Sequence, residues 1–242
     1  MCGRFVSTSS AAEVSEAFDA LVRAVDVPPN YNVAPTATIY GVVNRDNERL
    51  VENFSWGLVP VWAKDRTRAA SLINARSETI AEKASFRGLL KRHRCVIPLT
   101  GYYEWKPIEA SKSTKAYKQP YYFTPTQGEL LSVAGLWTTW KEPGSAPDEP
   151  VLHSCVLITT DANKTAGAIH NRMPVLLDSD GVDEWINDDE VAPLHLLKPA
   201  VNRFLKVIKV GTAVNSTRNR GPQLIEEIGD DQKGSPQLDS LF

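Results

Sequence analysis

The chain has 242 residues, of which 42% are hydrophobic and 23% are charged, and its net charge is −2 at pH 7. This length and hydrophobic content suffice for one large folded domain with its own core. No run approaches the roughly 20 apolar residues that span a membrane, and the N-terminus lacks the basic and apolar regions of a signal peptide. The composition therefore excludes an integral membrane protein, and we expect a soluble one.

Cysteine usage indicates the redox environment. The three cysteines, Cys2, Cys95 and Cys155, are odd in number and far apart, and no C-x-x-C pair occurs. This spacing argues against a disulfide framework and a zinc cluster. We expect a reducing compartment and no metal or other cofactor.

The first half of the chain predicts one amphipathic helix followed mainly by strands. Val14, Phe18, Leu21 and Val22 share one face of a helix over residues 9–24, with Ser9 or Ser10 as its cap. A proline-broken loop over 27–36 follows, and then a hairpin of two strands, 38–43 and 49–57. Residues 71–76 are short and extended, and the pattern Thr79-x-x-Glu82 opens a second helix over 79–93.

The second half predicts further strands and short helices. The expected strands cover 94–98, 100–106, 119–124, 129–140, 153–160 and 205–210. Asp161 is a good N-cap for a short helix ending near Ile169, and short helices are expected at 182–187 and 192–197. No internal repeat or long linker appears. We expect an α+β fold, a single domain over residues 1–228 with a mostly antiparallel, barrel-like β-sheet and peripheral α-helices, and a flexible tail over 229–242.

The small net charge hides an uneven distribution. The segment from Pro60 to Cys95 holds nine Lys or Arg residues and three acidic residues, a local charge of +6, so the remainder carries −8. Most charge runs are solvated helix faces. A basic surface that follows a phosphate backbone is the other interpretation.

The chain opens with MCGRF. Methionine aminopeptidases remove Met1 before a small residue, and Cys2 would then carry a free α-amine and a thiol. This 1,2-aminothiol condenses with aldehydes to a five-membered thiazolidine ring. An α-amine titrates at about 7.7–8.0 and a thiol at about 8.5 in model compounds, so each is partly nucleophilic at neutral pH without tuning. An incidental cysteine in a frayed terminus is the simpler interpretation of these five residues alone.

Generic nucleotide-binding and hydrolase motifs such as G-x-x-x-x-G-K-[ST], G-x-G-x-x-G, G-x-S-x-G and H-E-x-x-H are absent. Polar residues instead stand beside apolar runs in LINAR, GYYEW and IHNRMP. Glu104 lies among three aromatic residues that would desolvate its carboxylate and raise its pKa. Taken singly, Glu104 also fits an outward-facing strand position, His170 a helix terminus, and Asn74 a turn or cap.

Six strings occur in a characteristic order: MCGRF, YNVAPT, WGLVPVW, INARSET, GYYEW and IHNRMP. Together they span residues 1 to about 175, and they resemble the SRAP (SOS response-associated peptidase) family. The resemblance implies a protein that crosslinks itself to abasic sites in single-stranded DNA and so shields the lesion. It implies Cys2 as the nucleophile, Asn74 as the residue that orients it, and Glu104 and His170 as the acid/base pair.

The resemblance also implies a set of DNA contacts. Arg4, Arg76 and Arg172 match phosphate-binding positions, and Thr159 matches a further DNA contact. Pro35, Trp62 and Trp105 match groups that wedge or stack at the bent strand. Several relatives have a second tryptophan where this chain has Ala63, so stacking beside the lesion is expected to be weaker or to come from another residue.

Two other functions are consistent with the same residues. One is a thiol peptidase, acting on itself or on other chains with Cys2 as an N-terminal nucleophile; the other is a non-catalytic module that binds single-stranded or modified DNA. The ending QLDSLF resembles peptides that dock on the replication sliding clamp, although a chance apolar tail explains it too. We expect a monomer, nucleoid-associated in a bacterial cytoplasm or nuclear in a eukaryote.

Overall fold

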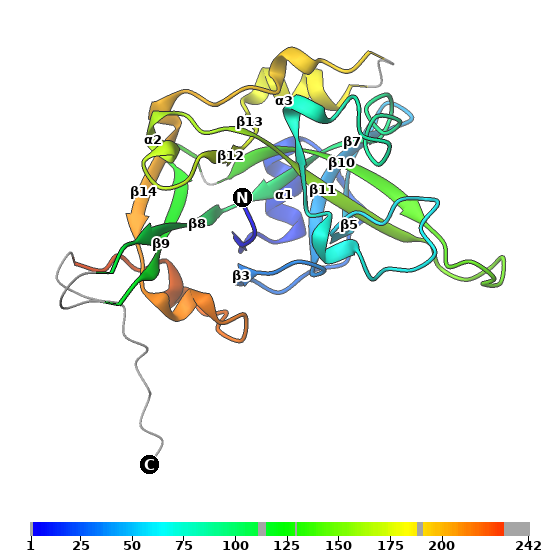
Figure 1. Ribbon diagram of the computed structural model, residues 1–242. Helices are drawn as coiled ribbons and strands as arrows, with labels where there is room; N and C mark the ends of the chain where they lie inside the picture. Colours follow the sequence, from blue (N-terminus) through cyan, green and yellow to red (C-terminus); the bar gives the residue numbers. More distant parts are fainter. Residues whose placement is uncertain (1, 111–114, 129, 188–190, 230–242) are drawn as a thin grey trace.

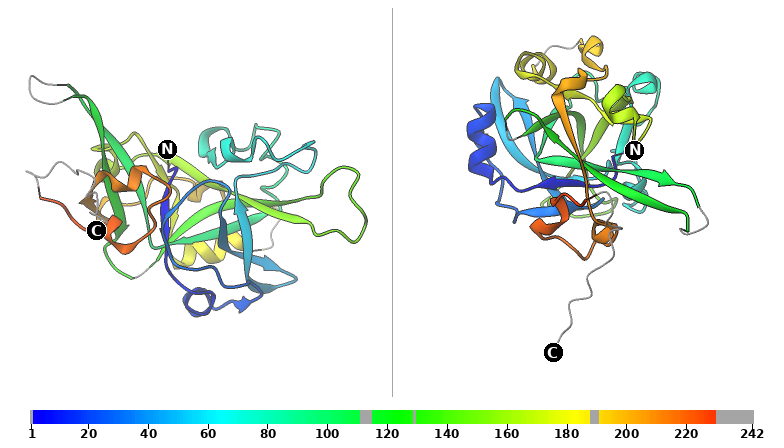
Figure 2. Two further views of the ribbon diagram at one scale, coloured as in Figure 1. Left: turned by 90° about the horizontal axis from the view of Figure 1, so that it is seen from below. Right: turned by 90° about the vertical axis from the view of Figure 1, so that its left-hand side faces the viewer.

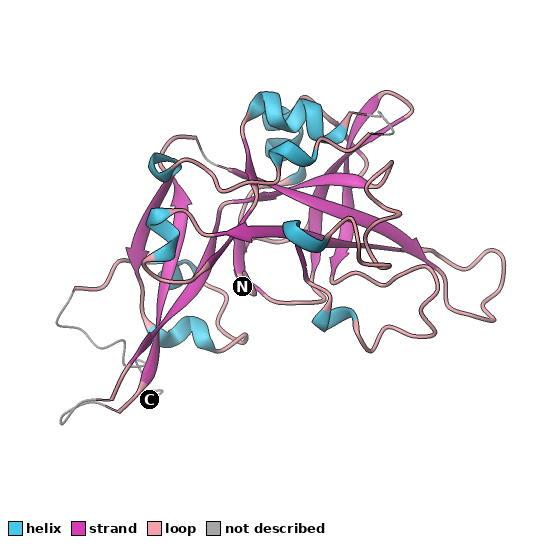
Figure 3. Cartoon of the chain, turned by 45° about the horizontal axis from the view of Figure 1, so that its top comes forward, coloured by secondary structure: helices cyan, strands magenta, loops and turns pink. Residues whose placement is uncertain are grey.

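Two β-sheets make up most of the chain, and short helices lie around them (Figures 1 and 3). The structure is a computed structural model and describes residues 2–110, 115–128, 130–187 and 191–229. The α-helices are α1 (Ala11–Phe18), α2 (Lys164–Gly167) and α3 (Ser179–Ile186). The strands are β1 (Phe5–Ser7), β2 (Leu21–Val22), β3 (Asn30–Val33), β4 (Thr38–Arg45), β5 (Glu48–Trp56), β6 (Asn74–Arg76), β7 (Arg94–Leu99), β8 (Gly101–Ile108), β9 (Tyr117–Pro125), β10 (Leu131–Trp140), β11 (Leu152–Asp161), β12 (Arg172–Pro174), β13 (Leu176–Leu177) and β14 (Leu205–Lys209).

One sheet closes on itself. Strands β5, β4, β7, β10 and β11 are successive neighbours, and β11 also pairs in parallel with β5, which completes a ring. The second sheet has the order β14-β9-β8-β1-β3. Most pairings are antiparallel; the parallel ones are β2–β5, β6–β11 and β5–β11. The predicted α+β fold, a single domain with a mostly antiparallel, barrel-like sheet, is therefore confirmed.

Helix α1 begins where the sequence predicts and ends earlier. Ser10 accepts from the backbone N–H of Glu13, whose carboxylate accepts from the N–H of Ser10 at 2.7 Å, which completes a capping box. The helix ends at Phe18, because Asp19 adopts a left-handed conformation with φ 47°. Leu21 and Val22 are exposed and pair with β5, so the prediction of a helix to residue 24 is wrong.

The predicted helix over 79–93 is also wrong. A 3₁₀ turn (Ser77–Thr79) leads into a series of turns, in which Thr79 accepts through its backbone oxygen and forms no capping box. Phe86 and Leu90 are buried, so packing on the barrel fixes this segment although it lacks helical continuity. Arg94 is buried as well and donates to the carbonyl oxygens of Leu90 and Lys91. Tertiary contacts thus override a helical pattern that is marginal on its own.

Two smaller predictions need correction. The segment 27–36 contains strand β3, which pairs with β1, so it is not entirely loop. Asp161 is the last residue of β11, and Asn163 caps α2 instead, by accepting from the N–H of Ala166. The helix itself lies where it was predicted.

The amino-terminal strand lies where the two sheets meet. Figure 1 shows the start of the chain near the middle of the molecule, with β8 and β9 on one side and β5, β10 and β11 on the other. Phe5 packs on Trp56 with 4.7 Å between ring centroids, and Cys2 and Tyr102 belong to the same buried cluster. Figure 2 shows α1 on the outside of the sheets, away from this junction. Among the described residues, no helix combines the length and apolar character that a bilayer crossing requires.

Candidate active site

Cys2 is fully buried at the junction of the two sheets. Its carbonyl oxygen accepts a hydrogen bond of 2.9 Å from the side-chain nitrogen of Asn74. Asn74 is held there because β6 runs parallel to β11, with Asn74 opposite Leu157. Burial raises the pKa of the Cys2 thiol far above its ordinary value, and the nearby Glu104 carboxylate raises it further. The expectation that this thiol is partly ionised without tuning is therefore wrong.

Glu104 lies on β8 beside the amino-terminal segment. The N–H of Tyr103 donates to the carbonyl of Arg4 at 3.0 Å, so the chain before β1 continues along β8. The Glu104 side chain is 3% exposed, and burial raises its pKa to about 7, while the positive amino terminus acts in the opposite direction. A carboxylic acid with this pKa exchanges protons near neutral pH, as its aromatic neighbours predict.

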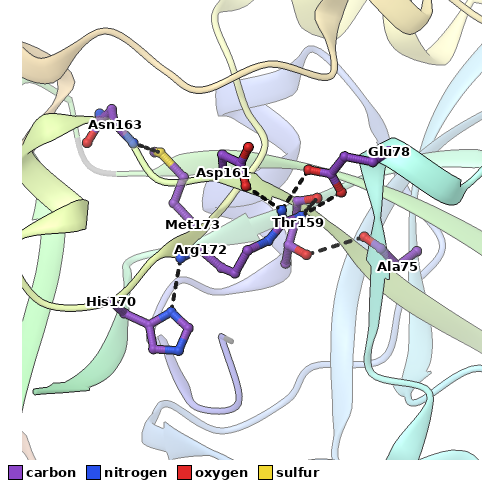
Figure 4. A network of polar contacts seen from close by, with 8 residues as sticks. All are labelled: Ala75, Glu78, Thr159, Asp161, Asn163, His170, Arg172 and Met173. Atoms are coloured by element: carbon purple, nitrogen blue, oxygen red, sulfur yellow. Dashed lines mark hydrogen bonds and ion pairs between the residues drawn. The ribbon is translucent and has the colours of Figure 1, made fainter. Parts of the chain in front are cut away.

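His170 follows α2 and is half-buried. Its Nδ1 accepts a hydrogen bond of 3.0 Å from the backbone N–H of Arg172, which leaves Nε2 to carry the proton of the neutral ring (Figure 4). Burial lowers the pKa of His170, and the positive charges of the amino terminus, Arg172 and Lys118 lower it further. The ring is therefore largely neutral at pH 7 and able to accept a proton.

A cavity of about 420 Å³ joins these groups to solvent. It is lined by Arg4, Glu104, Trp105, Lys118, His170 and Asn215. Four of these are site residues predicted from the sequence, contributed by the amino-terminal segment, β8 and the loop after α2. Cys2 is buried next to them, and the half-buried Asn74 contacts its backbone. The arrangement brings together a thiol, a carboxyl group with a pKa near 7 and a neutral imidazole, which are groups that act in acid–base and nucleophilic catalysis.

Arg4 is fixed by a residue that the sequence analysis did not select. Its guanidinium donates to Asn32 Oδ1 at 2.9 Å and to the carbonyl of Val214 at 3.2 Å. The Asn32 amide in turn donates to the carbonyls of Val214, Ser216 and Asn219. In the sequence, only the position of Asn32 within the YNVAPT string could have indicated this role, because its burial is known from the structure alone. Trp105 is anchored similarly, because its indole N–H donates to Asn215 Oδ1 at 2.7 Å.

Arg172 is engaged within the protein. Figure 4 shows its guanidinium between Glu78 and Asp161; Nη1 is 2.6 Å from Glu78 Oε1 and 2.8 Å from Asp161 Oδ1. Nη2 donates to the carbonyl of Thr159 at 2.8 Å. Thr159 is fully buried and its hydroxyl donates to the carbonyl of Ala75. The predicted DNA contacts at Arg172 and Thr159 would therefore need this network to rearrange.

The remaining predicted DNA contacts lie outside the cavity. Trp62 is 66% exposed and lines a second cavity of about 280 Å³. Arg76 is exposed at the end of β6, and Pro35 is half-buried in the turn after β3. Of the nine cations between residues 60 and 95, Arg94 is buried and the others are exposed. The basic segment is thus a solvated surface, as both interpretations of it require.

Comparisons with known proteins identify the family. The model of the family "SOS response associated peptidase (SRAP)" matches residues 1–217. The chain is 36% identical over 231 residues to the abasic site processing protein YoqW of Bacillus subtilis, covering 93% of this chain and 99% of that protein. It is 32% identical to the abasic site processing protein HMCES of Gallus gallus, covering 83% of this chain and 66% of that protein. A crystal structure of a Bacteroides thetaiotaomicron protein has the same fold, with a TM-score of 0.80 at 24% identity, covering 94% of this chain and all of that one. The chain is therefore a member of the SRAP family.

Proposed function

We propose that this protein binds single-stranded DNA and captures abasic sites covalently through Cys2, as a thiazolidine. The observation that carries the proposal is the convergence of Asn74, Glu104 and His170 on the amino-terminal segment that contains Cys2. The names of two relatives, which describe them as abasic site processing proteins, support the same substrate. Removal of Met1 is part of the proposal, because the ring needs the α-amine of Cys2.

The reaction consumes the open-chain aldehyde of an abasic deoxyribose. The α-amine of Cys2 adds to the aldehyde carbon to give a carbinolamine, which loses its hydroxyl group as water to form an imine. In this proposal the neutral His170 ring accepts and returns the protons of this step, which its lowered pKa supports. The sulfur then adds to the imine carbon, the C–S bond forms, and the C=N electron pair becomes the N–H bond of the ring. The net change is loss of one water molecule.

Ring closure needs a base, because the buried thiol is protonated at neutral pH. Glu104 is suited to this role, since its pKa of about 7 matches the pH at which it must accept the proton. Asn74 holds the backbone of Cys2 in place. Positioning amine, thiol and aldehyde together replaces a bimolecular encounter, an effect worth about 7–11 kcal/mol in ideal cases.

Single-stranded DNA suits this cavity, because an abasic sugar enters it at little unstacking cost. The Arg4 guanidinium lies two residues from Cys2 and would hold a phosphate beside the reacting sugar. Arg76 would contact the backbone outside the cavity. Exposed Trp62 and the basic segment 60–95 would follow the flanking nucleotides without reading their sequence.

Intact mass spectrometry tests the proposal. The protein is mixed with an oligonucleotide that contains one abasic site, and the expected adduct has the summed mass of the chain without Met1 and the oligonucleotide, less one water. Cys2→Ala should give no stable adduct, whereas Cys2→Ser should give an imine that borohydride traps. A heat-stable adduct of undiminished yield from Cys2→Ala would falsify the thiazolidine mechanism.

The same preparation separates the alternatives. One extra residue placed before Cys2 blocks its α-amine. A non-catalytic binding module would still bind DNA with unchanged affinity, whereas covalent capture would stop. Incubation with peptides tests the peptidase function that the family name suggests. Cleavage of peptides without any adduct on abasic DNA would favour a thiol peptidase.

A further inference from the structure

We propose that Lys118 is a phosphate-binding residue of the cavity, holding the backbone of the captured strand together with Arg4. This inference rests on the proposed function, and it adds a contact that the six sequence strings do not include. Lys118 belongs to β9, and its side chain lines the 420 Å³ cavity with Glu104 and His170.

Lys118 on β9 and Arg4 in the amino-terminal segment bring two positive charges to this cavity. The Arg4 guanidinium is oriented by the neutral groups of Asn32 and Val214, so no carboxylate offsets its charge among the partners that the structure gives it. Lys118 is exposed and takes part in none of the ion pairs of the described residues. An abasic nucleotide in a strand carries a phosphate on each side of its sugar. Two such cations match two phosphates.

The contrast with Arg172 strengthens this assignment. Arg172 bridges Glu78 and Asp161 and has a side chain only 12% exposed, so a phosphate must displace two carboxylates to reach it. Lys118 meets no such competition among the described residues. A lysine also suits this position, because its ammonium is a point charge that accepts a phosphate from several directions. Lys118 is therefore, beside Arg4, the second cation that lines the cavity without a carboxylate partner among the described residues.

The test is non-covalent binding at several salt concentrations. The oligonucleotide carries a tetrahydrofuran in place of the abasic sugar, so it has no aldehyde and cannot crosslink. We compare the wild-type chain with Lys118→Met, Lys118→Arg and Lys206→Met by fluorescence anisotropy. Lys206 is the matched control, since it is exposed on β14 of the same sheet and does not line the cavity.

Each phosphate contact on a single strand contributes about 0.7 to the slope of log affinity against log salt. Lys118→Met should therefore reduce the slope by about 0.7 and weaken binding about fivefold at roughly 0.1 M salt. Lys118→Arg should restore both, and Lys206→Met should change neither. Equal affinity and slope for Lys118→Met and wild type would overturn the Lys118 assignment alone. Failure of the wild-type chain to bind any single strand would overturn this inference and the proposed function together.

A second readout locates the charge without DNA. His170 lines the cavity with Lys118 and Glu104, and the positive charges of the amino terminus, Arg172 and Lys118 contribute to its lowered pKa. Removing that charge in Lys118→Met should raise the pKa of His170, measured by NMR titration of its ring protons. Lys206→Met should leave this pKa unchanged. The same pKa of His170 in all chains would contradict the placement of Lys118 in the cavity.

Discussion

At the scale of single residues, Glu104 links the stability of the fold to pH. Its pKa is raised from 4.5 to about 7 by burial, so the folded chain holds this proton more tightly than the unfolded chain. The stability contributed by neutral Glu104 is fully present below about pH 4.5 and is lost as the pH rises through about 7. The site thus maintains an unfavourable buried carboxylate at the pH where it can act as a base.

Glu104→Gln should remove this loss, because glutamine is neutral at every pH. Urea unfolding at about pH 5 and about pH 8 measures how much the free energy of unfolding falls between the two conditions. We expect the wild-type chain to lose more stability than Glu104→Gln between the two conditions. Parallel losses in the two chains would mean that Glu104 ionises with its ordinary pKa.

Two buried tyrosines on β8 provide a second comparison. Tyr103 donates from its hydroxyl to the carbonyl of Tyr31 at 2.8 Å, whereas the Tyr102 hydroxyl has no hydrogen-bond partner among the described residues. Tyr103→Phe should destabilise the fold by about 1 kcal/mol, since it removes a hydrogen bond. Tyr102→Phe should leave the free energy of unfolding unchanged or raise it, since it removes an unsatisfied hydroxyl. Equal destabilisation by both, in chemical denaturation, would show that Tyr102 has a partner in solution.

The sequence predicted the surroundings of some candidate residues better than those of others. Glu104 among aromatic residues predicted a desolvated carboxyl group, and burial does raise its pKa. The protonated state of Cys2 was not foreseen, because it depends on packing between two sheets. Asn32 and Lys118 were missed for the same reason. Their importance comes from neighbours distant in sequence, Val214 and His170 respectively.

At the scale of elements, capping patterns in the sequence predicted where helices begin, and tertiary contacts determined how far each helix extends. Ser10 and Glu13 form the capping box of α1, yet the helix stops at Phe18, because the following residues add a strand to the barrel. The pattern Thr79-x-x-Glu82 predicted a helix. The structure has a series of turns there instead, because this arrangement buries Phe86 and Leu90. Asp161 resembled a cap, and its carboxylate instead pairs with Arg172.

This ion pair network joins three elements and makes a prediction about DNA binding. Glu78 from the turn after β6 holds the guanidinium of Arg172 on β12, so it competes with any phosphate for that group. Glu78→Gln should therefore tighten binding to single-stranded DNA and steepen its salt dependence. Anisotropy titrations measure both, with Glu82→Gln as a control that removes an exposed acid from the same segment. No change specific to Glu78→Gln would indicate that Arg172 serves the fold and not the DNA.

At the scale of the whole molecule, the domain boundary predicted at residue 228 lies next to a structural contact. Val210 forms an isolated bridge with Glu227, and the N–H of Ile228 donates to the carbonyl of Lys209. The predicted tail lies, apart from Gly229, outside the described residues.

A chain ending at Gly229 should therefore keep the melting temperature and the crosslinking yield of the full chain. Binding to a purified sliding clamp, if the QLDSLF ending provides it, should be lost. Calorimetry, mass spectrometry and a clamp titration measure the three properties. A lower melting temperature would show that the tail packs on the domain, and equal, negligible clamp binding by both chains would remove the docking hypothesis.

The burial of Cys2 bears finally on how the protein survives between encounters with damage. Exposed thiolates react with peroxides and disulfides, and oxidation beyond sulfenic acid is largely irreversible. A sulfur that is enclosed between two sheets and kept protonated is protected from this oxidation. The proposed capture uses one sulfur for one aldehyde, so this sulfur must still be reduced when a lesion arrives, and the packing that keeps it protonated also protects it from oxidation.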